Sequence, residues 1–206
     1  MREDTAERAG FSLVGWVVAF AGAAGLAGCI TLLYRGMAVI MSTEGGFVAS
    51  GGPYEIAHPA PDWAWLVPLS IMSGMAFGGM SLAGSFRGWG VNPALFAWMG
   101  LFISLGWNFL RLGLIDPPEN LESGWGWVVS GVVFWLMGFA PSVMLVHVVR
   151  DTWRQVLGRQ TGPARIAWAM PAATRTTPAY VAAQLLGVAG GIAGALALFA
   201  SVAQGY

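Results

Sequence analysis

Long apolar segments alternate with shorter polar ones along the whole chain. The apolar segments run over residues 11–34, 68–86, 93–114, 125–149 and 179–203. A hydrocarbon core about 30 Å thick is crossed by about 20 helical residues. Each segment is therefore predicted to be a membrane-spanning helix, and the fold to be an all-α bundle of five such helices in a single domain, residues 1–206.

Local signals mark several of the expected helix ends. Asn92-Pro93 is typical of an N-cap followed by proline at the first helical position, where its missing N–H costs nothing. Asp116 and the two prolines after it predict the end of the third helix. Pro141 lies inside the fourth segment and predicts a kink there.

Composition supports a membrane protein and excludes several other classes. Hydrophobic residues make up 56% of the chain and charged residues 10%, whereas a soluble domain carries about 25% charged residues. The single cysteine, Cys29, lies in an apolar run. One cysteine allows no disulfide within the chain and no cysteine-based zinc cluster.

The arginines are distributed unevenly between the loops. With the N-terminus inside, the inner segments hold Arg2, Arg8, Arg87, Arg150, Arg154, Arg159, Arg165 and Arg175, and the outer ones hold Arg35 and Arg111. Basic residues favour the cytoplasmic side, so the N-terminus is predicted inside and the C-terminus outside. The basic inner loop, residues 150–178, is expected to attract anionic lipid headgroups and not nucleic acid. Its first residues are expected to continue the fourth helix.

Small residues recur on one face of two of the helices. The set on the second helix is Ser70, Gly74, Gly78, Ser81 and Ser85; the set on the fifth includes Ala183, Gly187, Gly190, Gly194, Ala197 and Ser201. Steps of three and four keep each set on one face, and small faces let helix backbones approach closely in lipid. Two interpretations stay open: the faces close the bundle on itself, or one of them, with the fifth helix favoured, contacts another polypeptide.

Polar residues within the spans are few, and they define a possible polar site. Asn108, Arg111 and Gln184 are its members. Polar and ionisable groups inside a membrane suggest function, and these three would line the path of a transport or channel protein. The structural alternative for Arg111 is that its side chain reaches the outer headgroups.

The outer loop, residues 35–67, offers a second possible site. It contains Glu55, His58 and Asp62, which could serve an enzyme or a metal site at the outer surface if they converge. One histidine with scattered carboxylates is a weak metal signal. The structural interpretation is an ordered cap in which Tyr54 and Trp63 are buried and proline and glycine make the turns.

The sequence GGFVASGGPYEIAHPAP in this loop resembles that of a group of small bacterial multi-pass membrane proteins of no known activity. The resemblance covers about a tenth of the chain. In that group a cysteine commonly stands at the position of Val48 and another at that of Ala60. The resemblance implies a disulfide between those positions that this chain lacks.

These patterns together predict a non-catalytic protein of the bacterial inner membrane. It is expected to be an accessory or scaffold subunit that packs with other membrane subunits or with copies of itself, without a cofactor. A small transport or channel component is the first alternative, and an outer-surface membrane enzyme is the second.

The resemblance generates a test in the outer loop. The double substitution Val48→Cys and Ala60→Cys is expected to form a disulfide under oxidising conditions, because the two positions would then carry the cysteines of the similar proteins. Mass spectrometry with and without a thiol-blocking reagent measures it. Two blockable thiols in the oxidised protein would contradict the predicted pairing.

Overall fold

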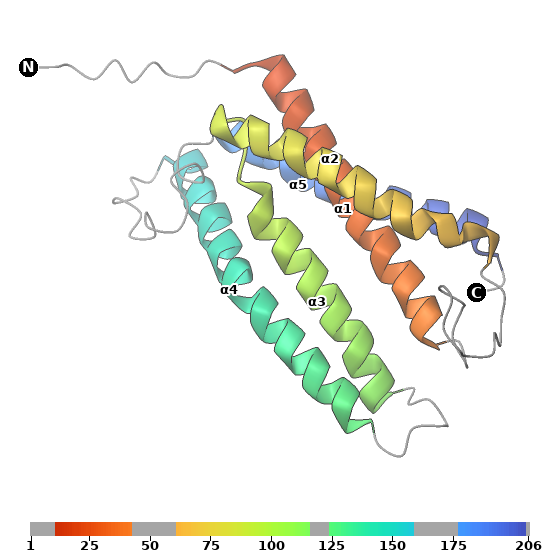
Figure 1. The fold of residues 1–206 in the computed structure, drawn as a ribbon. Helices are drawn as coiled ribbons and strands as arrows, with labels where there is room; N and C mark the ends of the chain where they lie inside the picture. Colours follow the sequence, from red (N-terminus) through yellow and green to blue (C-terminus); the bar gives the residue numbers. More distant parts are fainter. Residues whose placement is uncertain (1–10, 43–60, 116–123, 159–176, 205–206) are drawn as a thin grey trace, which may run out of the picture.

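The computed structural model describes residues 11–42, 61–115, 124–158 and 177–204, and these ranges are helical apart from short turns. The helices are α1 (Leu13–Ser42), η1 (Asp62–Trp65), α2 (Leu66–Phe86), α3 (Pro93–Leu114), α4 (Trp125–Val156) and α5 (Pro178–Val202). Five of them are long and apolar enough to cross a membrane. The expected all-helical class and the presence of five candidate spans are confirmed (Figure 1).

The helices on both sides of the predicted outer loop extend into it. α1 continues past Arg35 to Ser42, and η1 and α2 occupy residues 62–86, so the predicted outer loop 35–67 is shortened at both ends. Arg35 lies within α1, and its guanidinium lies over the Phe199 ring, 5.4 Å from the centroid. α4 continues to Val156, which confirms the expectation that the first residues of the segment 150–178 continue the fourth helix.

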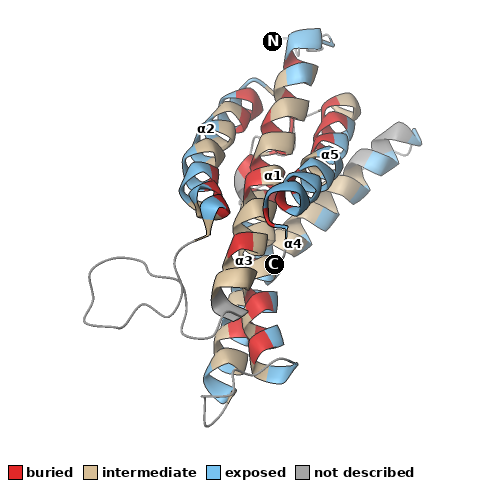
Figure 2. Ribbon diagram, turned by 90° about the vertical axis from the view of Figure 1, so that its right-hand side faces the viewer, coloured by how far each residue is buried: buried red, intermediate tan, exposed pale blue. Residues whose placement is uncertain are grey.

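α1 lies between its neighbours and contacts α2, α3 and α5 (Figure 2). Its middle is rich in alanine and glycine, and Ala23 is fully buried. Such small side chains on every side of one helix let three others approach its backbone. Ser12 lies beside Tyr180 at the start of α1 and α5, and Arg35 lies on Phe199 towards their ends. The first and fifth helices are therefore parallel.

The contact between α1 and α2 contains the small face predicted on the second helix. Ser70, Ser81 and Ser85 are buried there, and Gly74 and Gly78 lie opposite Cys29 and Leu26. A Cβ atom on Gly22 of α1 would collide with the Ser81 hydroxyl. The hydroxyls of Ser70 and Ser81 make no hydrogen bond to any described residue, so their small volume serves this contact.

The small face predicted on the fifth helix divides between two environments. Gly187 packs against the Phe20 carbonyl of α1, whereas Gly190 and Gly194 are exposed and a Cβ atom on either would meet nothing within 4 Å. The contact with α1 continues instead through Gly191, against the Ala24 carbonyl. Its members recur in steps of four: Ala183, Gly187, Gly191, Ala195 and Phe199.

α3 and α4 form an antiparallel hairpin held by glycines and aromatic side chains. Gly106 faces Gly131, and Gly113 faces Gly124, each so closely that a Cβ would lie within 3 Å of the partner's carbonyl oxygen. Indole N–H groups also bridge the two helices. Trp135 Nε1 donates to the Ile103 carbonyl at 3.1 Å.

Pro141 lies inside α4, which continues through it. Proline has no N–H, so the carbonyl four residues earlier, that of Met137, receives no intrahelical hydrogen bond. Trp98 of α3 supplies the missing donor: its Nε1 lies 3.0 Å from the Met137 oxygen. In hydrocarbon an unpaired carbonyl costs several kcal/mol, so Trp98 and Pro141 depend on each other.

This dependence is testable by a double-mutant cycle. Trp98→Phe is expected to lower the free energy of unfolding in detergent by about 1 kcal/mol more in the native chain than in a Pro141→Ala background. The alanine restores an N–H that reaches the Met137 carbonyl.

Trp135→Phe is the matched control for that cycle. It removes the equivalent indole hydrogen bond to the Ile103 carbonyl. Unlike the Met137 carbonyl, the Ile103 carbonyl keeps its intrahelical donor, the N–H of Trp107. Its effect should be the same in both backgrounds. Additive effects of Trp98→Phe and Pro141→Ala would refute the pairing.

Candidate functional site

The turn between α2 and α3 positions the first of the predicted polar residues. α2 ends in a Schellman motif: the N–H of Gly88 donates to the Ser85 carbonyl at 3.0 Å and that of Trp89 to the Gly84 carbonyl at 2.9 Å. Gly88 has φ +77°, a left-handed conformation that favours glycine at this position. The chain then passes through Gly90 and Val91 to the start of α3 at Pro93.

Gln184 of α5 holds this turn. Its Oε1 accepts from the Val91 N–H at 2.7 Å, and its Nε2 donates to the Val91 carbonyl at 3.0 Å. The side chain is 5% exposed. Gly90 has φ +128°, and a Cβ there would lie 2.6 Å from the Gln184 amide. Both the conformation and the space at Gly90 therefore require glycine.

Asn108 bonds to the backbone of a different helix. It is 3% exposed, and its Nδ2 donates to the Tyr34 carbonyl of α1 at 3.2 Å. Arg111 lies in the last turn of α3 and is exposed. That position suits a side chain that extends towards headgroups.

The structure does not gather the three predicted polar residues into one site. Gln184 bonds at Val91, just before α3 begins, whereas Asn108 lies 15 residues after Pro93. At 1.5 Å per residue this is about 22 Å along the helix. Gln184 and Asn108 therefore act separately, each tying a neighbouring helix to a backbone group.

The predicted outer-loop site is only partly within the described residues. Glu55 and His58 lie outside them, as do Tyr54, Val48 and Ala60. Asp62 is exposed at the start of η1. The described ranges contain no cluster of three or more metal-ligating side chains.

Trp63 anchors the end of that loop on the bundle. It is 3% exposed and meets Phe199 edge to face, with ring centroids 5.2 Å apart. Leu66 and Ala203 complete a buried cluster with these two rings, and Leu32 packs against it. The expectation that Trp63 is buried is confirmed.

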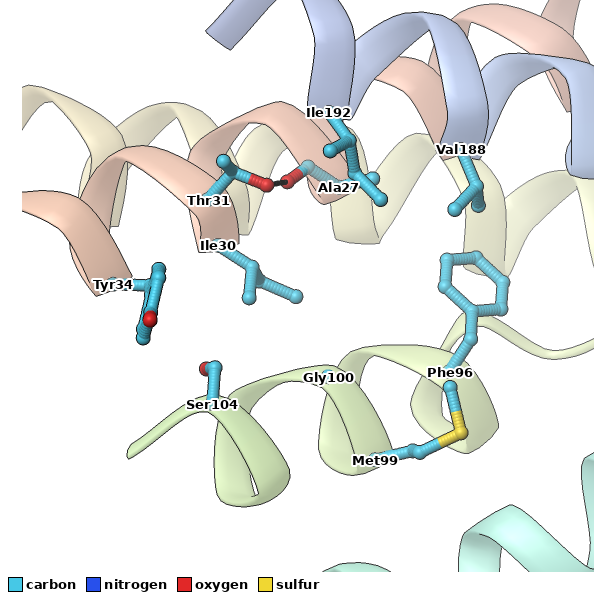
Figure 3. Close-up of a pocket in the computed structure, with 10 residues that line it drawn as sticks. All are labelled: Ala27, Ile30, Thr31, Tyr34, Phe96, Met99, Gly100, Ser104, Val188 and Ile192. Carbon is cyan, nitrogen blue, oxygen red and sulfur yellow. Dashed lines mark hydrogen bonds between the residues drawn. The ribbon is translucent and has the colours of Figure 1, made fainter. Parts of the chain in front are cut away.

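An apolar cavity of about 220 Å³ lies between α1, α3 and α5 (Figure 3). α1 contributes Ile30, Thr31 and Tyr34 to its lining, and the Phe96 ring of α3 points towards Val188 of α5. The Thr31 hydroxyl donates to the Ala27 carbonyl at 2.8 Å. The cavity therefore offers mainly hydrocarbon surface.

The main contacts missed by the sequence analysis are those of Val91 and Gly191. Val91 acts through its backbone, which no side-chain pattern reveals. The four-residue step from Ala183 to Gly187 indicates Gly191 as the next residue on the face towards α1. The predicted face instead continued with Gly190, which points away from α1. Gly90 in the GWGVNP turn was a visible hint that a bulky group approaches there.

No protein-family model matches this chain, and comparison with curated proteins and with solved structures gives no match either.

The Gln184 bond gives a direct test of its role. Gln184→Met keeps the length of the side chain but leaves the Val91 N–H and carbonyl unpaired, and it is expected to lower the free energy of unfolding by about 1–2 kcal/mol. Thermal or denaturant unfolding in detergent measures this. The control is Leu185→Met at the neighbouring exposed position, which should change little. Equal stability of both variants would contradict the structural role.

Proposed function

We propose that the chain is a non-catalytic integral membrane protein, an accessory or scaffold subunit that packs in a larger membrane assembly. The observation that carries the proposal is the outward small face of α5, defined as Gly190, Gly194, Ala197 and Ser201. All four residues are exposed, and Gly190 and Gly194 have open space beside them.

This face has the properties of a helix-packing surface. Two glycines four residues apart on one face let a second helix approach closely, and van der Waals packing drives association in lipid. A glycine in a helix interior costs about 1 kcal/mol relative to alanine. The contact with α1 explains that cost at Gly187 and Gly191, and a partner helix would explain it at Gly190 and Gly194.

The use of the polar residues favours packing over conduction. A transport path needs polar groups that can meet a solute, whereas Gln184 and Asn108 are buried and bonded to backbone groups of this chain. The described cavity between α1, α3 and α5 is apolar. The outer-surface enzyme rests on Glu55, His58 and Asp62, of which Asp62 alone is described.

The proposal includes an orientation in the bacterial inner membrane, with the N-terminus inside. Arg87 after α2 and Arg154 in the last turn of α4 belong to the end of the bundle where α1, α3 and α5 begin. Arg111 lies at the opposite end, in the last turn of α3. This division supports the positive-inside assignment.

Native mass spectrometry of the protein, extracted gently from its own membrane, tests the assembly. We expect a stoichiometric complex with other membrane subunits. The substitutions Gly190→Leu and Gly194→Leu together should dissociate it, because the introduced side chains would keep a partner helix away.

Gly79→Leu on α2 is the matched control, since that position is also exposed with nothing within 4 Å. It should leave the complex intact. A native protein that is always monomeric, or a complex that survives the double substitution on α5, would refute the proposed face.

A further inference from the structure

The cavity between α1, α3 and α5 is large enough for an apolar ligand. Its volume is about 220 Å³, whereas an apolar protein cavity of about 150 Å³ already accepts a benzene-sized molecule and stays dry. Polar lining groups are few, and Thr31 and Ser104 direct their hydroxyls to carbonyls of their own helices, those of Ala27 and Leu101. Water would find little to bond, so an apolar occupant fits best.

The neighbouring helices are fixed in ways that keep the cavity open. At the inner end Gln184 ties α5 to Val91 before α3. Further along, Asn108 ties α3 to the Tyr34 carbonyl of α1. α5 is held against α1 by the Gly191 contact. Closing the space by moving α3 or α5 would break one of these contacts.

The cavity is accessible from the side of the bundle. Ile192 of α5 lines it and is nevertheless 40% exposed. The surface at this depth belongs to helices long and apolar enough to cross a membrane, where the surrounding solvent is lipid hydrocarbon. A chain from that solvent reaches the cavity without crossing a polar layer.

We propose that this cavity is a binding site for one acyl chain of a membrane glycerophospholipid. The chain enters between α3 and α5 and lies along Ile30, and its far part ends against Phe96 and Val188. The bound lipid fills the space that α3 and α5 leave beyond the cluster of Leu95 with Val181. It is thus an integral part of the bundle, distinct from the lipid that covers the outer faces.

Native mass spectrometry with stepwise activation tests this site on the full chain. The native protein should retain one glycerophospholipid after the loosely held lipid is removed. Gly100→Leu fills the cavity from α3, where a Cβ makes only an ordinary contact of 3.7 Å with Ile30. Ile192→Trp fills it from α5, so the test does not depend on one variant folding.

Each cavity-filling variant is expected to reduce the fraction of protein carrying the phospholipid about tenfold or more, since each buried methylene that is displaced weakens binding. Gly79→Leu, at an open position away from the cavity, should retain it like the native chain. Equal retention by the filled and native proteins would overturn the proposal. The proposal would also be overturned if the molecule retained by the native protein were an isoprenoid. It would likewise be overturned if the cavity-filling substitutions removed a second copy of this chain and not a lipid.

Discussion

The bundle depends on the close approach of helix backbones to α1. In lipid, apolar side chains gain nothing by leaving their surroundings for one another, so van der Waals packing must hold the helices together. Alanine and glycine around Ala23 give α1 a thin profile on the sides facing α2, α3 and α5. The Ser81 hydroxyl and the backbone at Gly191 occupy the space that larger α1 side chains would need.

The second constraint is that backbone polar groups in hydrocarbon must be paired. Two side chains supply partners that the backbone lacks locally: Gln184 at Val91 and Trp98 at Met137. Asn108 adds a bond from α3 to the Tyr34 carbonyl within α1. Each is a polar or indole group whose partner is the main chain of another element. This explains why polar residues deep in an apolar sequence need not mark a path for ions or solutes.

Much of the fold could be predicted from the sequence because span length and hydropathy are local properties. The start of α3 at Pro93 and the ends of α2 and α3 are among these. The extension of α1 beyond residue 34 could not be predicted in this way. Arg35 lies over the ring of Phe199, a residue distant in the chain, and a local pattern does not reveal that contact. The sequence also identified Gln184 and Asn108 as unusual, but their partners are backbone atoms, which residue types do not reveal. On α5, either Gly190 or Gly191 could follow Gly187 on the face towards α1, because steps of three and four are both helical. The packing against α1 shows that Gly191 does.

The parallel contact between α1 and α5 has a consequence for biosynthesis. The ribosome delivers α1 first among the described helices and α5 last, and α2, α3 and α4 enter the membrane between them. Until α5 arrives, the α1 surface at Phe20 and Ala24 lacks its partner helix, and the backbone of Val91 lacks its amide. The final insertion step therefore completes both contacts at once. A chain stalled before that step would present to the lipid a narrow, glycine-sized groove on which a foreign helix could settle.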